Sequence, residues 1–152
     1  DKISHSKLIT KLNAHGISGK VADWIKEWLK DRKQYVVIEG AESGVIYVIS
    51  GVPQGSVLGP ILFIIYINDI DQVVKKLEII KKFADDTKGA KVVKDQTDAD
   101  DMQGALEELS QWSKIWSMDF NIKKCKIMHV GRSNPKFNYK IDGVDLTVVE
   151  AE

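Results

Sequence analysis

The sequence predicts an α+β fold in which helices cover one face of an antiparallel sheet. Apolar residues recur at three- and four-residue steps in three segments, which is the pattern of amphipathic helices. Pairs of β-branched and aromatic runs flank turn-forming residues in three other segments, which is typical of hairpins. The chain has 152 residues, of which 43% are hydrophobic and 29% are charged, so we expect a single domain with a hydrophobic core.

Four helices are expected along the chain. The first begins near Ile3 and ends at Gly16, and the second covers residues 19–29. The third covers residues 60–67 and is apolar on nearly every side, so we expect it to be buried. The fourth covers residues 98–118. The second and fourth helices are expected to bury the four tryptophans together with other apolar residues: Val21, Trp24, Ile25, Trp28, Leu29, Met102, Leu106, Leu109, Trp112, Ile115 and Trp116.

Three hairpins and one further strand are expected between and after these helices. Each hairpin joins two runs that are rich in β-branched, aromatic or other apolar residues. The paired runs are residues 35–38 with 45–49, residues 78–84 with 87–93, and residues 139–141 with 146–149. Asp85 and Asp86 lie between the second pair, and Asp142 and Gly143 lie between the third. The further strand covers residues 126–130.

The charges of the chain do not indicate a protein that binds nucleic acid by itself. Lys and Arg number 22, and Asp and Glu also number 22, so the formal net charge is zero. Affinity for nucleic acid comes largely from neutralised phosphates, so binding here would depend on local basic clusters or on neighbouring segments. Two clusters are candidates, although solvated surfaces explain both: Lys75, Lys76, Lys81 and Lys82; and Lys123, Lys124, Lys126, Arg132 and Lys136.

Cysteine usage and hydropathy indicate a protein that acts inside the cell. Cys125 is the only cysteine, which excludes an internal disulfide and a cysteine-based metal site. The longest apolar stretch, residues 60–67, is much shorter than the roughly 20 residues that cross a bilayer. No signal peptide is visible at the start. We therefore expect an intracellular protein with no membrane partner.

Asp85 and Asp86 form a candidate metal site within the second hairpin. Two adjacent carboxylates repel each other, and a divalent cation removes that conflict. Mg²⁺ prefers oxygen ligands, keeps several waters and is usually held by one or two carboxylates together with substrate phosphates. The pair is therefore a reasonable half-site for nucleotidyl transfer with two metal ions. The alternative is that the two aspartates simply form a good turn.

The segment from Gly51 to Ser56 has the composition of a rigid turn that faces a ligand. Its glycines permit close approach of a ligand to the backbone, and Pro53 stiffens the frame that presents Gln54. Ser56 leads into the apolar helix, whose N-terminus carries positive potential suited to phosphate. No Gly-Lys-Ser/Thr follows, so the segment is not the phosphate loop of nucleotide hydrolases. A structural turn explains the glycines and prolines equally well, but it does not explain the glutamine.

Three segments together carry a resemblance to a known family. They are GVPQGSVLGPILF at residues 51–63, FADDTK at residues 83–88 and NIKKCK at residues 121–126. These segments are similar to the template- and nucleotide-gripping segment, the catalytic F/YADD hairpin and the N-x-x-K segment of reverse transcriptases of non-LTR retrotransposons, of the jockey-like kind. The resemblance extends over the whole chain. It implies a polymerase palm, with an antiparallel sheet backed by helices, and RNA-directed DNA polymerase activity.

The resemblance also implies roles for the matching residues. Asp85 and Asp86 would bind the catalytic metals, which are two Mg²⁺ or Mn²⁺ ions in the complete enzyme. Lys124 would act near the leaving pyrophosphate as a proton donor, although a solvated surface lysine is the equal alternative. The implied partners are an RNA template, a DNA primer and deoxynucleoside triphosphates, in the cytoplasm and the nucleus. Four residues would line the nucleotide and template site: Pro53, Gln54, Gly55 and Ser56.

One departure from the family pattern concerns its first catalytic motif, D-x-x-x-A-F/Y-D. Asp1 aligns with the closing aspartate of that motif, so the opening metal-binding aspartate would precede residue 1. We therefore expect residues 1–152 to form a partial palm, from just after the first catalytic aspartate to before the thumb. The fingers and thumb would belong to the same polyprotein. Such a fragment is expected to be inactive alone, and the alternative is a decayed or truncated remnant that binds RNA weakly at most.

Overall fold

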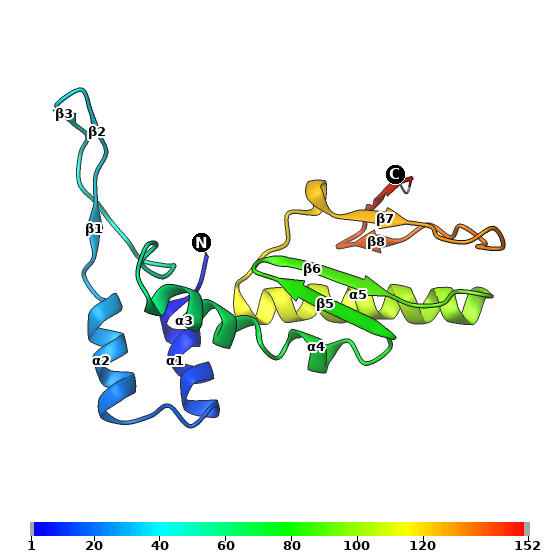
Figure 1. Ribbon diagram of the computed structural model, residues 1–152, viewed down its shortest axis with the longest axis horizontal. Coiled ribbons are helices and arrows are strands. Elements are labelled where there is room, and N and C mark those ends of the chain that lie inside the picture. Colours follow the sequence, from blue (N-terminus) through cyan, green and yellow to red (C-terminus); the bar gives the residue numbers. More distant parts are fainter. Residues whose placement is uncertain (1, 151–152) are drawn as a thin grey trace. The chain divides into compact units, whose positions relative to one another are not determined.

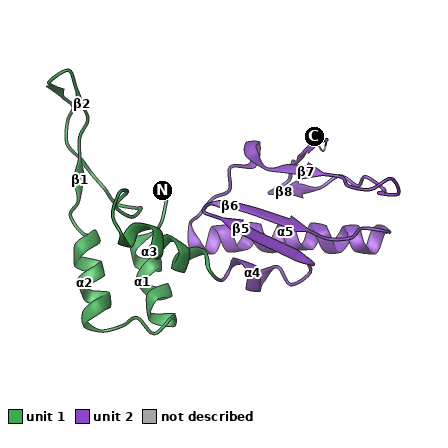
Figure 2. Ribbon diagram, in the orientation of Figure 1, with its two compact units in different colours: residues 1–68 green, residues 69–152 purple. Residues whose placement is uncertain are grey.

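The computed structural model describes residues 2–150 and confirms the α+β class, with short strand pairs beside helices (Figure 1). Contacts divide the chain into two compact units, Asp1–Asn68 and Asp69–Glu152 (Figure 2). Within the described residues the strands form five separate two-stranded ladders and not one antiparallel sheet. Most of these strands are only two or three residues long, which leaves little edge for a further strand to join.

The first unit is built on three helices. α1 covers His5–Ala14, α2 covers Lys20–Leu29 and α3 covers Leu58–Ile67. α1 contacts both of the others. The predicted end of the first helix is confirmed, since Gly16 takes a φ of 80° just after α1, a conformation that suits glycine. The core residues of this unit include several side chains with almost no exposed surface: Ile3, Leu8, Leu12, Leu29, Leu62 and Tyr66.

Two of these helices, α2 and α3, are less buried than predicted, because each leaves one apolar side exposed. Trp24 is 55% exposed and stacks on Trp28 along the surface of α2, with ring centroids 6.0 Å apart. The buried side of α2 holds Ala22, Ile25 and Leu29 instead, and Val21 is exposed as well. In α3, Leu62 and Tyr66 are buried while Ile61 and Ile64 are exposed. An apolar helix is buried only where another element covers it, and composition does not say which side that is.

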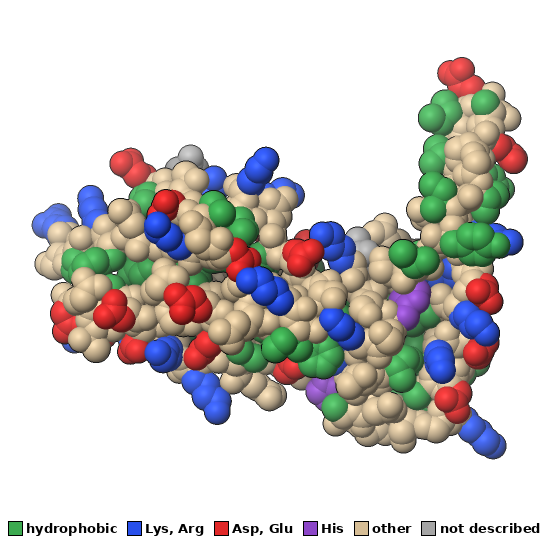
Figure 3. Space-filling view, turned by 180° about the vertical axis from the view of Figure 1, so that it is seen from behind, with side chains coloured by type: hydrophobic (Ala, Val, Ile, Leu, Met, Phe, Trp, Pro, Cys, Tyr) green, Lys and Arg blue, Asp and Glu red, His purple; other side chains and the backbone are tan. Residues whose placement is uncertain are grey.

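A long hairpin connects α2 to α3 (Figure 1). β1 (Lys33–Gln34) pairs with β4 (Ile46–Tyr47), and β2 (Val37–Ile38) pairs with β3 (Ala41–Glu42), both antiparallel. A hairpin forms in the predicted segment, but the expected pairing of residues 35–38 with residues 45–49 is wrong because the turn is tighter than expected. Glu39 and Gly40 form it with φ values of 49° and 84°, as in a two-residue type I′ turn. Figure 3 shows hydrophobic side chains along this hairpin, and the exposed ones include Val36, Val37, Ile38, Val45, Ile46, Tyr47 and Ile49.

The second unit is organised around one long helix. α5 covers Gln96–Trp116 and begins where the Asp95 carboxylate accepts a hydrogen bond from the Asp98 amide at 3.0 Å. The short helix α4 (Ile70–Val73) packs beside α5. Trp112 is buried as predicted, and its indole donates to the Asp69 carboxylate at 3.0 Å. The prediction for Ile115 is wrong, since its side chain is 64% exposed.

Three strand pairs complete the second unit. β5 (Ile79–Phe83) and β6 (Asp86–Ala90) are antiparallel, as are β8 (Lys140–Ile141) and β9 (Val144–Asp145). β7 (Lys126–Met128) pairs in parallel with β10 (Thr147–Val149). The predicted hairpin around Asp142–Gly143 forms, and the Leu146 amide donates to the Tyr139 carbonyl at 2.9 Å. The predicted pairing of residues 147–149 with residues 139–141 is wrong, because Val144 is the partner of Ile141 and residues 147–149 pair with β7. Six buried residues link these strands to α5: Ala99, Leu106, Ile127, Tyr139, Ile141 and Leu146.

The helices of the described chain lack membrane-spanning character. Within residues 2–150, no helix is both long enough and apolar enough to cross a bilayer.

Candidate active site

The hairpin of β5 and β6 holds the two predicted metal ligands at its tip (Figure 1). Ala84 and Asp85 form the two-residue loop, and Asp86 is the first residue of β6, where it pairs with Phe83. Ala84 takes a φ of 50°, whereas Asp85 is not among the described residues with positive φ. A positive φ is usual in the two-residue loops that join antiparallel strands. Of the two aspartates, only Asp85 lies in the turn, and Asp86 belongs to strand β6.

The two faces of this hairpin differ in exposure. Directly paired residues share a face, so Asp86 lies on the same face as Phe83, and Lys81 and Lys88 lie opposite each other on that face. All four of these residues are exposed, and Phe83 is 83% exposed. Two lysines directly opposite each other repel. The face that holds Asp86 therefore also carries a concentration of positive charge suited to a polyanion.

The carboxylates of Asp85 and Asp86 are open to a ligand. Both residues are exposed, and within residues 2–150 neither side chain takes part in a hydrogen bond or ion pair. The same described part of the chain contains no group of three or more His, Cys, Asp or Glu side chains that could hold a metal ion. Two adjacent carboxylates completed by water and substrate phosphate are a ligand set that Mg²⁺ accepts. The donor chemistry at this turn therefore fits an open divalent-cation site and not a closed one.

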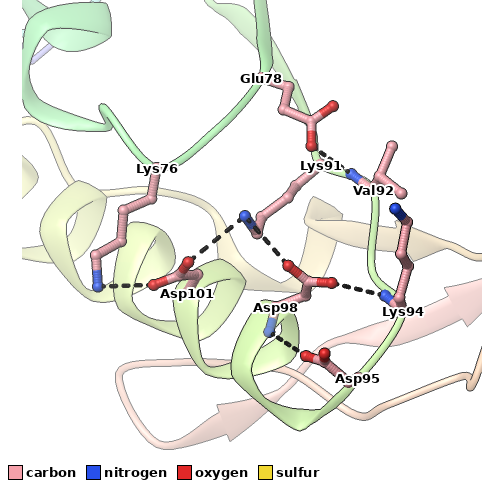
Figure 4. Close-up of polar contacts among 8 residues, drawn as sticks. All are labelled: Lys76, Glu78, Lys91, Val92, Lys94, Asp95, Asp98 and Asp101. Carbon is pink, nitrogen blue, oxygen red and sulfur yellow. Dashed lines mark hydrogen bonds and ion pairs between the residues drawn. The ribbon is translucent and has the colours of Figure 1, made fainter.

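Ion pairs tie the open end of the hairpin to α5 (Figure 4). Lys91 follows β6, and its Nζ lies 3.7 Å from Asp98 Oδ1 and 3.5 Å from Asp101 Oδ2. Lys76 precedes β5, and its Nζ lies 3.3 Å from Asp101 Oδ1. The hydrogen bond from Lys76, with help from Lys91, lowers the pKa of the Asp101 carboxyl. The Lys91 side chain is only 12% exposed, so this contact is shielded more than an ordinary surface pair.

Ion pairs engage two of the four lysines in the predicted basic cluster of Lys75, Lys76, Lys81 and Lys82. Lys76 pairs with Asp101, and Lys82 pairs with Asp71 at 3.1 Å. Lys75 and Lys81 are exposed. Part of this cluster therefore holds the hairpin in place, and part remains available on the surface.

The predicted nucleotide-binding turn is ordered by its own hydrogen bonds. Ser56 Oγ donates to the Pro53 carbonyl at 2.7 Å and accepts from the Gly59 amide at 2.9 Å. A Cβ at Gly59 would lie 2.7 Å from the Pro53 oxygen, so this position requires glycine. The one hydroxyl proton of Ser56 is thus engaged inside the turn. Gln54 and Gly55 are exposed, and the Gln54 side chain makes no hydrogen bond within the described chain.

Lys124 lies at the end of a short 3₁₀ helix, η1 (Ile122–Lys124). Its amide donates to the Asn121 carbonyl at 2.8 Å, and its side chain is exposed without an ion pair among residues 2–150. The neighbouring Cys125 is partly buried, which raises the pKa of its thiol and makes it less reactive. The proton-donor role of Lys124 remains a prediction. Asp1, which aligns with the closing aspartate of the family's first motif, lies outside the described residues.

Comparison with known proteins identifies the relatives of this chain. A family model described as reverse transcriptase (RNA-dependent DNA polymerase) matches residues 1–145. The RNA-directed DNA polymerase from mobile element jockey of Drosophila funebris is 32% identical over 135 residues, covering 82% of this chain and 14% of the relative. Its counterpart from Drosophila melanogaster is 32% identical over 110 residues, covering 66% of this chain and 12% of the relative.

A more distant relative covers more of the chain. The retrovirus-related Pol polyprotein from type-1 retrotransposable element R2 of Popillia japonica is 27% identical over 158 aligned positions, covering 94% of this chain and 26% of the relative. The chain thus spans between 12% and 26% of the length of these three proteins.

Proposed function

Because this chain belongs to the reverse transcriptase (RNA-dependent DNA polymerase) family, we propose that it forms part of the palm of an RNA-directed DNA polymerase from a non-LTR retrotransposon. The reaction would be nucleotidyl transfer, with an RNA template, a DNA primer and deoxynucleoside triphosphates. The observation that carries the proposal is the exposed pair Asp85 and Asp86 at the β5–β6 turn, which no other described side chain neutralises.

Asp85 and Asp86 would supply carboxylate oxygens to Mg²⁺ or Mn²⁺. When bound, such ions neutralise phosphate charge and act as Lewis acids in nucleotidyl transfer. The turn and the first pair of β6 set the positions of the two carboxylates, and the ion pairs of Lys76 and Lys91 support the hairpin from its open end. Lys81 and Lys88 would attract the phosphates of a nucleic-acid strand toward the face that holds Asp86.

The turn at residues 51–56 would contact the template and the incoming nucleotide. Gln54 is exposed, and its side-chain amide offers both a donor and an acceptor. Pro53 and Gly55 would shape the approach of the ligand on either side of it. Ser56 would act mainly by holding the Pro53 carbonyl, since its hydroxyl proton is already engaged there. Lys124 would donate a proton to the leaving pyrophosphate.

Primer extension tests this function. We expect the 152-residue chain to extend no oligo(dT) primer on poly(rA) with Mg²⁺ or Mn²⁺, because the opening aspartate of the first motif is not among its residues. A longer chain that includes that motif should extend the primer. In the longer chain, Asp85→Ala should reduce the rate by about a thousandfold or more, the cost of removing a principal group from a preorganised site.

Two outcomes would contradict the proposal. Extension by the 152-residue chain that disappears on Asp85→Ala would disprove the expected inactivity. A longer chain with an intact first motif that folds but extends no primer would favour a decayed remnant. A salt-dependent mobility shift with single-stranded RNA would then show whether that remnant still binds RNA.

A further inference from the structure

Three segments of the first unit meet at the backbone of Gly51. The Gly51 amide donates to the Ile3 carbonyl at 2.8 Å. The Gly51 carbonyl accepts from Arg32 Nη2 at 2.7 Å and from His5 Nε2 at 2.8 Å. A carbonyl oxygen has two lone pairs, so both are occupied, and His5 Nε2 must carry a hydrogen because the carbonyl can only accept. Gly51 is buried, and the neighbouring Ser50 forms a bridge with Ser4.

The guanidinium of Arg32 is held on its other side as well. Arg32 Nε donates to the carbonyl of Leu29, the last residue of α2, at 3.3 Å. The carbonyls at the end of a helix lack partners inside the helix, and a planar guanidinium presents several donors in a rigid arrangement. One side chain therefore joins the end of α2 to the start of the turn at residues 51–56. Burial lowers the pKa of Arg32, in line with a partly enclosed guanidinium.

The far end of the same turn is held separately by Ser56. Its hydroxyl joins the Pro53 carbonyl to the Gly59 amide at the start of α3. Gly51 and Ser56 are thus anchored to α1, α2 and α3, while Gln54 and Gly55 between them are exposed. The orientation of Gln54 then depends on two anchors, one of which is the pair of donors on the Gly51 carbonyl.

We propose that Arg32, together with His5, is a positioning residue that sets the orientation in which the turn presents Gln54. Arg32 acts through the Gly51 carbonyl and touches no substrate. The proposal rests on the proposed function for the contact of Gln54 with nucleotide or template. The positioning of Gln54 can be measured without any polymerisation, so the positioning role of Arg32 and the proposed polymerase function can fail independently.

Amide hydrogen exchange and ¹⁵N relaxation of the 152-residue chain test the proposal. Arg32→Met keeps the apolar stem and removes all the donors, whereas Arg32→Lys keeps one charged donor. We expect Arg32→Met to speed exchange of the Gly51 and Ser56 amides by about tenfold or more, since a hydrogen bond from a charged donor is lost. The order parameter of the Gln54 amide should fall in Arg32→Met and recover in part in Arg32→Lys.

Two controls separate positioning from general stability. Lys30→Met removes a nearby cation whose side chain is 57% exposed and pairs with Glu27 on the surface, and it should leave exchange at Gly51 unchanged. The amide of Leu12, inside α1, should keep its protection within about twofold in every variant if the effect is local. His5→Phe removes the second donor to the Gly51 carbonyl and should also speed exchange of the Gly51 and Ser56 amides. It therefore tests the proposal even if Arg32→Met does not fold.

Several results would overturn the proposal. They are unchanged exchange at Gly51 and Ser56 in both Arg32→Met and His5→Phe, an equal loss of protection throughout α1 and α3, or identical behaviour of the Met and Lys variants. Failure of primer extension in a longer chain would count against the proposed polymerase and would leave the result on Arg32 intact.

Discussion

Lys82 Nζ donates to Asp71 Oδ1 at 3.1 Å and so joins β5 to α4, one residue before the Phe83–Asp86 pair that closes the hairpin. The hydrogen bond from Lys82 lowers the pKa of the Asp71 carboxyl below its ordinary value of 3.8. Lys82 lies on the half-buried face of the hairpin, with 23% of its side chain exposed. This contact supports the hairpin near its tip, whereas Lys91 and Lys76 support it at its open end.

The stabilisation from Asp71 should depend on pH. Because the pKa of Asp71 is lowered in the folded chain, its contribution is present above the unfolded-state pKa of about 4 and is lost as the pH falls through the lower folded-state value. At pH 7, Asp71→Asn should reduce the free energy of unfolding by about 0.5–1 kcal/mol, a small value because the Asp71 side chain is 42% exposed. Urea denaturation at pH 7 and at acidic pH would measure the free energy of unfolding of the unsubstituted chain and of Asp71→Asn under each condition.

A matched substitution controls for the loss of a surface carboxylate. The Asp100 carboxylate accepts from the neutral amide of Gln96 and pairs with no lysine in the described chain, so Asp100→Asn removes a surface carboxylate without breaking an ion pair. If Asp71→Asn cost as much at acidic pH as at pH 7, the ion pair with Lys82 would not be the cause.

Two glycines should respond to alanine in opposite directions. A Cβ at Gly59 would lie 2.7 Å from the Pro53 carbonyl oxygen, and that backbone atom cannot easily move because Ser56 holds it. Gly59→Ala should therefore reduce the free energy of unfolding by about 1–3 kcal/mol. At Gly104, inside α5, the nearest atom to a Cβ is the flexible Lys76 Nζ at 3.1 Å. Gly104→Ala should stabilise the chain by up to about 1 kcal/mol through helix propensity.

Urea denaturation followed by circular dichroism would measure both glycine variants. A neutral Gly59→Ala would mean that the turn at residues 51–56 relaxes around the new methyl group. It would weaken the view that Ser56 and Gly59 hold the turn rigidly.

The two aspartates of the hairpin should be dispensable for stability and necessary for metal binding. Since neither carboxylate has a partner in the described chain, Asp85→Ala and Asp86→Ala should each change the free energy of unfolding by no more than about 0.5 kcal/mol. Mn²⁺ should broaden the amide signals of residues 83–87 in NMR spectra, and the double variant should lose this broadening. These results would show that the two carboxylates bind the metal ion and do not stabilise the fold.

Another adjacent acidic pair provides the control for metal binding. Asp100 and Asp101 lie on α5, and Asp101 is already paired with Lys76 and Lys91. Asp100→Ala removes one carboxylate of this pair and breaks no ion pair that supports the hairpin, so it should leave Mn²⁺ broadening at residues 83–87 unchanged. Broadening that follows Asp100 and Asp101 instead would place the cation elsewhere and contradict the assignment to the hairpin.

Local patterns predicted the helices and most hairpins correctly because they depend on neighbours in the chain. The apolar spacing of α1, α2 and α5 and the glycine at position 16 are short-range signals, as is the turn at Asp142–Gly143. The exposed positions of Trp24, Ile61 and Ile115 were predicted wrongly. Burial depends on which side of a helix another element covers, and that information is not local.

Some features of the candidate site could be predicted from the sequence and others could not. Asp85, Asp86 and Gln54 were identified from short motifs, and their metal- and nucleotide-binding roles stay predictions. The supporting contacts of Lys91 with Asp98 and Asp101, and of Arg32 with Gly51, gave no sequence signal. A lysine or arginine in a mixed-charge segment resembles a solvated one until its distant partner is known.

By itself, the sequence determined the family, the order of the longer helices and the position of the carboxylate pair at the tip of a hairpin. Only the tertiary structure decided that Asp86 shares an exposed face with Phe83, Lys81 and Lys88, and that residues 147–149 pair with β7 in parallel. It also decided that Gly51 is held by Arg32 and His5. The physical reason is that helix propensity and turn chemistry act within a few residues, whereas strand register, ion pairs and burial are set by residues far apart in the chain.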